Sequence, residues 1–184
     1  MEIADEDLMQ RVGAGDADAC RVLVERHLGR VVAFADRILG NPSDARDVAQ
    51  DVFARVWTSA ASWRPGPARF TTWLHRVALN LCLDRLARRR EATLDNAPDP
   101  IDPGANPAGR VEEDETARIV GAAVATLPER QRVALALCHY QGLRNDEAAE
   151  IMDVTVEALE SLLARARRTL RERLLPVAGE LLGA

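Results

Sequence analysis

Four polar side chains recur every fourth residue in one apolar stretch, at Arg76, Asn80, Asp84 and Arg88. At 3.6 residues per turn they form one stripe along a helix whose other positions are mostly leucine, valine and alanine. We therefore expect a helix over 70–90 that is buried on most sides and exposes one narrow charged edge. Such an edge could hydrogen-bond a polar or anionic partner. The alternative interpretation is a core helix with a solvated edge.

Aromatic residues gather just before this stripe. Five of the seven aromatic side chains lie there, in and around a Pro- and Gly-containing loop expected over 58–69. Trp63 in this loop has Arg64 and Arg69 as neighbours, and aromatic and arginine side chains around a loop could capture an unstacked base. The alternative is a loop tryptophan folded onto the helices. The five aromatic residues are Phe53, Trp57, Trp63, Phe70 and Trp73.

A second arginine cluster lies near the end of the chain. Asn145–Met152 is expected to be a short helix, Asp153 and Val154 a turn, and Thr155 the cap of a longer helix. Two helices across such a turn are typical of a helix-turn-helix, whose second helix enters the major groove, although other helical hairpins fit the pattern too. The expected core face of the second helix is Leu159, Leu163, Ala166 and Leu170. Its far end carries Arg165, Arg167, Arg168, Arg171 and Arg173, a pattern that indicates phosphate binding.

An acidic helix face is expected after residue 43. Ser43 is a candidate N-cap, and the following helix has an apolar face that includes Val48 and Phe53. Asp47 and Asp51 lie four residues apart on another face, with further polar residues beside them. This face is either solvated or a docking surface for a basic partner.

Between these elements the composition changes. Residues 93–109 contain four prolines and little apolar side chain, and 93–117 carry seven acids against one base. We therefore predict an all-α chain with two small helical domains, at 1–92 and 112–184, joined by a flexible acidic linker at 93–111. The net charge of −5 does not exclude nucleic acid, because arginine sits in patches away from the linker.

Several function classes find no support in the residues. No apolar run is long enough for a membrane span, and the acidic N-terminus has no signal-peptide pattern, so we expect a cytoplasmic protein without membrane insertion. Three cysteines without a C-x-x-C fit a reducing compartment, and the three histidines show no metal-ligand spacing. With no phosphate loop or nucleophile–base set, we predict no enzyme, no metal and no cofactor.

Three motifs in this order resemble the extracytoplasmic-function (ECF) class of bacterial RNA polymerase sigma factors. The part of region two that docks on the clamp of the polymerase largest subunit is similar to DARDVAQDVFARVW. The part that melts and reads the promoter −10 element is similar to FTTWLHRVALNLCLDRLARRR. Region four, which reads the −35 element and touches the polymerase flap, is similar to the stretch from LPERQRVALALCHYQG to ESLLARARRTL.

The resemblance implies a role for each surface. The core-polymerase contacts would be Asp44, Asp47, Gln50, Asp51 and Arg55. The −10 contacts, to single-stranded promoter DNA, would be Trp63, Arg64, Arg76, Asn80, Asp84 and Arg88. The contacts to the double-stranded −35 element would be Arg144, Thr155, Glu157, Glu160, Ser161, Arg165, Arg167, Arg168 and Arg171. It also implies an anti-sigma factor as a partner and a stress-type promoter specificity, with the acidic linker in a basic channel of the polymerase.

Four positions depart from the pattern of most relatives: Leu79, Asp153, Glu160 and Leu162. They affect which promoter is read rather than the class of protein. The competing hypotheses are a free-standing helix-turn-helix regulator, which would leave the acidic face without a role, and a helical adaptor, which would leave the arginines without one.

Overall fold

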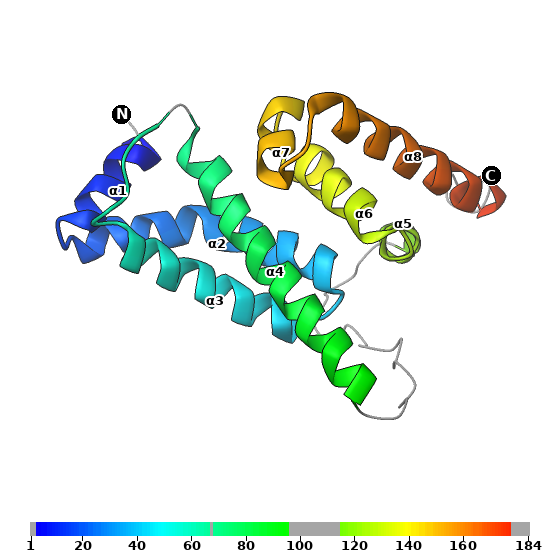
Figure 1. Cartoon of the computed structure of the whole chain (residues 1–184), viewed down its shortest axis with the longest axis horizontal. Helices are drawn as coiled ribbons and strands as arrows, with labels where there is room; N and C mark the ends of the chain where they lie inside the picture. The colour runs from blue at the N-terminus through cyan, green and yellow to red at the C-terminus, as the bar shows by residue number, and fades with distance from the viewer. Residues whose placement is uncertain (1–2, 67, 96–114, 178–184) are drawn as a thin grey trace.

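The computed structural model describes residues 3–66, 68–95 and 115–177, and these ranges contain helices and turns but no strand. The first lobe consists of α1 (Asp5–Gly13), α2 (Ala17–Leu39), α3 (Pro42–Ser59) and α4 (Phe70–Asp95). The second consists of α5 (Glu115–Ala125), α6 (Glu129–Leu135), the π-helical turn η1 (Ala136–Tyr140), α7 (Asn145–Met152), α8 (Val156–Leu174) and the 3₁₀ turn η2 (Leu175–Val177). The predicted all-α, two-lobed fold is confirmed (Figure 1).

The helix ends of the first lobe follow local chemistry. The Asp16 carboxylate accepts a hydrogen bond from the backbone N–H of Ala19 at the start of α2, and Gly40, at φ 63°, ends that helix. At the next helix the predicted Ser43 cap is wrong. Asn41 is the cap, because its side chain accepts from the backbone of Ser43 and Asp44 while Pro42 takes the first helical position.

The core of the first lobe lies between α2, α3 and α4. The predicted apolar face of α3 is buried, including Val48, Val52 and Val56, and it packs with Phe34 of α2. Each such side chain contributes about 1.5–3 kcal/mol when it leaves water.

Helix α4 is buried along its first half, at Leu74, Ala78 and Cys82, and every position from 87 to 93 is exposed. The helix continues to Asp95, so the first three residues predicted as linker are helical, with the Thr93 hydroxyl donating to the carbonyl of Arg89. The rest of the predicted linker, 96–111, lies outside the described residues.

The helix-turn-helix prediction is confirmed. Asp153 takes the left-handed conformation (φ 52°) between α7 and α8, and Thr155 caps α8 by accepting from the N–H of Ala158 at 3.2 Å. Leu159 and Leu163 are buried against the neighbouring helices, as expected. The π-helical turn η1 was not predicted.

The two lobes pack against each other, with α7 on α4 and with α6 and η1 on α2. The Arg30 guanidinium donates to the Gln141 carbonyl at 2.7 Å, and the Gln141 side chain donates back to the Arg30 carbonyl at 3.2 Å. Arg37 stacks on the Tyr140 ring at 4.0 Å from its centroid. Among the helices of the described ranges, none is both long and apolar enough to cross a bilayer.

Candidate nucleic-acid interface

The polar stripe on α4 exists, but its four members differ in surroundings. Asn80, Asp84 and Arg88 are exposed. Arg76 is half-buried, because its Nη2 donates to the Glu150 carbonyl at 2.7 Å and lies 3.2 Å from the Glu150 carboxylate. The first arginine of the stripe is therefore held by α7 of the other lobe, while the remaining members face solvent.

Two arginines beside the stripe, which were not predicted as site residues, join α4 to α3. Arg85 donates to Asp44 at 2.5 Å and to Asp47 at 2.8 Å, and Arg89 also donates to Asp44. The hydrogen bonds to Asp44 and Asp47 raise the pKa of Arg85 above its ordinary value. In the sequence, Asp44 and Asp47 lie three residues apart and Arg85 and Arg89 lie four apart, so each pair occupies one face of its helix. Such pairs can form ion pairs when the two faces pack together.

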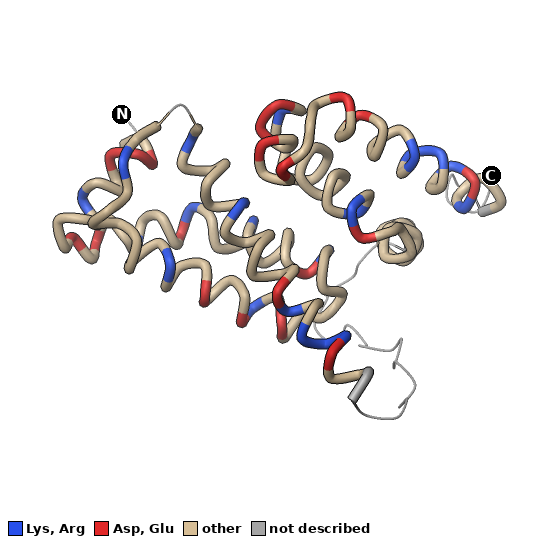
Figure 2. The backbone as a smooth tube through the Cα atoms, in the orientation of Figure 1, with Lys and Arg blue, Asp and Glu red and all other residues tan. Residues whose placement is uncertain are grey.

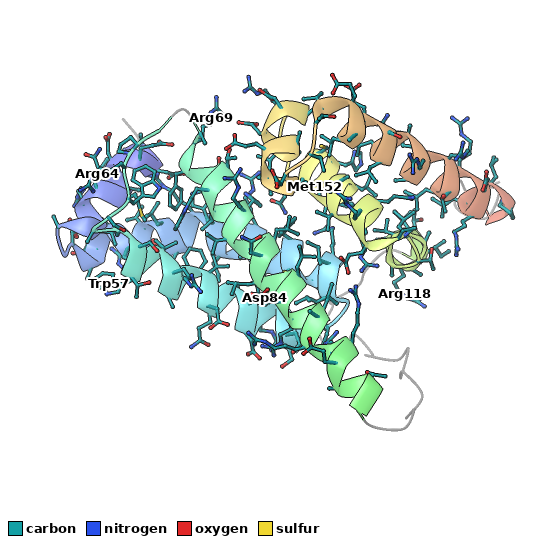
Figure 3. All side chains as sticks on the ribbon, viewed as in Figure 1. Trp57, Arg64, Arg69, Asp84, Arg118 and Met152 are labelled. Atoms are coloured by element: carbon teal, nitrogen blue, oxygen red, sulfur yellow. The ribbon has the colours of Figure 1, made fainter. Side chains whose placement is uncertain are left out.

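The acidic face of α3 is largely open to solvent. Asp47, Gln50, Asp51 and Arg55 are exposed on the side opposite the buried valines, whereas the Asp44 side chain is only 16% exposed. Asp44 thus stabilises the α3–α4 packing. Trp57, 47% exposed near the end of α3, extends the surface with a large apolar side chain (Figure 3).

Trp63 is neither fully exposed for base capture nor fully packed onto the helices. It is half-buried, and its ring meets Phe70 edge-on at 6.4 Å between centroids. Phe70 in turn lies 5.8 Å from the Trp73 ring. The neighbouring Arg64 is exposed and donates to the carbonyls of Ala61 and Trp63. One edge of Trp63 is therefore fixed by the lobe and the rest is accessible.

Four of the nine predicted −35 contacts lie at the cap and first turns of α8: Thr155, Glu157, Glu160 and Ser161. Glu160 accepts from the Asn145 side chain at 3.3 Å, and Ser161 accepts from Arg165 at 2.9 Å. Hydrogen bonds from its own N–H and from Thr155 lower the pKa of Glu157. Arg144, just before α7, is engaged by Asp146 at 2.8 Å.

The arginines of the later turns of α8 gather towards its C-terminal end (Figure 2). Within the described residues, no carboxylate lies at ion-pair distance from any of them, and all are exposed. Cations there are favoured by the helix dipole and stay available to an external anion. These residues are Arg165, Arg167, Arg168, Arg171 and Arg173.

Comparison with known proteins assigns both lobes. Residues 23–92 match the family Sigma-70 region 2, and residues 117–170 match the family Sigma-70, region 4. The chain is 30% identical over 187 residues to the ECF RNA polymerase sigma-E factor of Haemophilus influenzae, covering 96% of this chain and 98% of that protein. The chain belongs to the ECF family of RNA polymerase sigma factors.

Other relatives agree. The Escherichia coli ECF sigma-E factor is 30% identical over 96% of this sigma factor and 97% of its own length. The ECF sigma factor SigE of Mycolicibacterium smegmatis is 33% identical, and the aligned part spans 60% of that protein. The structure of CnrH in complex with the cytosolic domain of CnrY is 29% identical, covers 94% of this chain and 97% of its own, and has a TM-score of 0.69. The sigma factor RpoE of Bartonella quintana, solved with the anti-sigma factor NepR, shares the fold at TM-score 0.73 and 24% identity over 84% of this chain and 95% of that one.

The family assignment separates the surfaces of this sigma factor. The acidic face of α3, Trp63 and the α4 stripe all lie in region 2, and the helix-turn-helix lies in region 4. Helix α1 precedes the matched residues, yet it contacts α2, α3 and α4.

Proposed function

We propose that this sigma factor binds core RNA polymerase through the exposed acidic face of α3 and directs it to promoters by reading a −10 and a −35 element. Asp47, Gln50, Asp51 and Arg55 meet the clamp of the largest subunit, and region 4 meets the flap. The exposed carboxylates on a helix with a rigid apolar back support this docking, because they offer a positioned counter-charge to a basic partner. The protein acts in the cytoplasm, as a transcription initiation factor rather than an enzyme.

The −35 element is bound as duplex by α8. Glu160 and Ser161 lie where a recognition helix meets base edges, and the free arginines further along the helix supply phosphate attraction. The single observation that carries the proposal is this exposed arginine cluster, which no described carboxylate pairs, on the second helix of a helix-turn-helix that matches region 4.

The −10 element is bound as a single strand by α4 and the Trp63 segment, defined here as residues 60–66. Arg76, Asn80, Asp84 and Arg88 offer phosphate and base-edge contacts, and Trp63 with Arg64 stacks on an unpaired base. Arg76, the first member of the stripe, is held by Glu150 of α7, so the lobes have to separate before the whole stripe meets DNA. The packed form suits a state held by an anti-sigma factor.

Run-off transcription with purified core polymerase, with and without this protein, tests the proposal. The expected result is a defined transcript only when the protein is present. A free-standing helix-turn-helix regulator would instead bind duplex DNA equally well without polymerase and would start no transcript. That result would overturn the proposed function.

A further inference from the structure

Helix α1 lies at the end of the first lobe where α3 ends and α4 begins (Figure 1). Its residues contact the connection between these helices at both ends. At the far end, the Glu6 carboxylate accepts a hydrogen bond from the backbone N–H of Phe70 at 2.9 Å. Phe70 is the first residue of α4, so Glu6 satisfies one of the N–H groups that a helix start leaves unpaired, and its charge is favourable there.

A second set of contacts runs through a histidine. His27 of α2 is buried, and its Nε2 lies 2.7 Å from Oδ2 of Asp5, whose Oδ1 accepts from Arg26 at 2.8 Å. The His27 ring lies 5.7 Å from the ring of Phe70, the same ring on which Trp63 packs. Asp5 thus fixes the support beneath Trp63.

The third contact lies where α3 ends, at Ala60. A Cβ added to Gly13, the last residue of α1, would lie 2.6 Å from the backbone carbonyl oxygen of Ala60. That approach is closer than real Cβ atoms allow, so only glycine lets α1 lie directly on the backbone that begins the Trp63 segment. Since the obstacle is backbone, a larger residue has to displace the segment.

These three contacts hold Ala60, the first residue of the Trp63 segment, and Phe70, the first residue of α4 beyond it, while residues 64–66 have no regular secondary structure. Holding the ends lowers the conformational entropy that the segment loses when it receives a base. We infer that α1 positions the Trp63 segment for base capture, with Glu6 as a positioning residue at the start of α4, which follows the segment, and Gly13 as the required close contact at Ala60, where the segment begins. This inference rests on the proposed −10 role of Trp63.

The test uses holoenzyme assembled from core polymerase and the full chain. Glu6→Ala removes the acceptor for the Phe70 N–H, and Glu6→Gln keeps an acceptor oxygen. Asp7→Ala is the matched control, an exposed acid on the same helix. Permanganate reactivity of −10 thymines reports promoter opening, and affinity for a duplex with only the −35 element reports α8, which lies in the other lobe.

For Glu6→Ala we expect promoter opening to fall about fivefold, the equivalent of one lost hydrogen bond. The affinities of Glu6→Ala for core polymerase and for −35 duplex should stay within twofold of wild type, as should those of the control Asp7→Ala. Glu6→Gln should restore most of the opening, and Gly13→Ala should show the same selective loss as Glu6→Ala. Should Glu6→Ala fail to fold, Glu6→Gln and Gly13→Ala still decide the matter.

Equal opening by wild type, Glu6→Ala and Gly13→Ala would overturn the inference while leaving the proposed function intact. So would a parallel loss of core affinity, −35 affinity and opening, because that pattern belongs to a purely structural role. If the wild-type holoenzyme opens no promoter, the proposed function itself fails, and that outcome is separate from the first two.

Discussion

The two candidate DNA-binding helices differ in what their arginines do in the isolated protein. Around the α4 stripe Arg88 is exposed, but the other cations are engaged by the protein's own groups: Arg76 by Glu150, Arg85 and Arg89 by Asp44, and Arg90 by Glu129. On the later turns of α8, no described carboxylate is close enough to pair with the arginines. One helix carries an internally compensated charge and the other an open one.

This difference has an energetic consequence. An anion that binds α8 replaces only water and counterions, so its affinity should follow the salt dependence of phosphate binding. An anion that binds the start of α4 must also displace Glu150 and the α7 surface from Arg76. Under the proposed function, binding at −10 would therefore be coupled to release of Arg76 from α7, whereas phosphate attraction by the later arginines of α8 would not. The same contrast between paired and free charge applies on α3, where Asp44 is paired and Asp51 is exposed.

The largest effect is expected from reversing two exposed acids of α3, Asp51 and Asp47, of which Asp47 also accepts a hydrogen bond from Arg85. In the double variant Asp47→Arg, Asp51→Arg, affinity for core polymerase should fall at least about 100-fold, since like charges then face a basic partner. Helical content by circular dichroism should not change, because both side chains are exposed. Co-purification with core at the wild-type yield would show that this face is only solvated.

Removing the paired carboxylate of Asp44 should instead lower the stability of the fold. Asp44→Ala leaves Arg85 and Arg89 without their shared acceptor, and we expect the free energy of unfolding to fall by about 2 kcal/mol. Asp51→Ala, the matched change at a free acid, should stay within about 0.5 kcal/mol. Urea denaturation of the three proteins measures both. Equal stabilities would mean that the Asp44 network adds nothing to the fold.

On α8, recognition of the base sequence and attraction of the phosphates should depend on different residues. Glu160→Ala should lower discrimination at one −35 base pair by about 1–2 kcal/mol, because a carboxylate can accept from a cytosine amino group. Arg168→Ala should weaken binding to all sequences alike and reduce the salt dependence by about one charge. Binding to a library of −35 variants at two salt concentrations distinguishes the two. If Glu160→Ala tightened every site equally, Glu160 would repel phosphate and read no base.

The sequence predicted those features that depend on neighbouring residues. The turn at Asp153 and the cap at Thr155 were both expected and are both present. The Ser43 cap was wrong because two cap residues flank Pro42, and a proline in the first helical position fits only the earlier one, Asn41. The rule that proline favours the first helical position therefore places the cap at Asn41, two residues before the predicted Ser43.

The contacts that link distant segments were not predictable in this way. The Glu6 carboxylate meets an N–H that is 64 positions away, and Arg85 meets Asp44 across 41 positions. Periodicity shows which face a side chain occupies, but not which face of another helix lies opposite. The sequence therefore predicts each helix face separately, and only the packing of the helices shows which side chains of different faces form pairs.

Acid should weaken the fold at the junction of the lobes. Burial lowers the pKa of His75, while the hydrogen bond of its Nδ1 with the Thr71 carbonyl acts in the opposite direction. An unfolded histidine titrates near 6.5, so below about that pH the unfolded chain binds a proton that the folded chain does not. The free energy of unfolding should then fall from pH 7 to pH 5, by up to about 1.4 kcal/mol per unit for one proton.

Urea denaturation at pH 7, 6 and 5 measures this dependence. His75→Gln should flatten it, and His139→Gln, at an exposed histidine, should leave it as in the wild type. A dependence that persists unchanged in His75→Gln would show that His75 is not the group responsible.

The smallest effect tests whether the lobes compete with DNA. Glu150→Ala removes the carboxylate at Arg76 but leaves the Glu150 carbonyl, which is the shorter of the two contacts, at 2.7 Å. Both side chains are nearly half exposed, at 44% and 48%, so the ion pair is partly screened and should contribute less than about 1 kcal/mol. A single-stranded −10 oligonucleotide should therefore bind Glu150→Ala about threefold more tightly, which is about 0.7 kcal/mol. Duplex −35 DNA should bind the variant and the wild type equally, because α8 makes no ion pair that the change disturbs. Equal gains for both ligands would mean that Glu150 only adds general negative charge, and that Arg76 is as open to DNA as the arginines of α8.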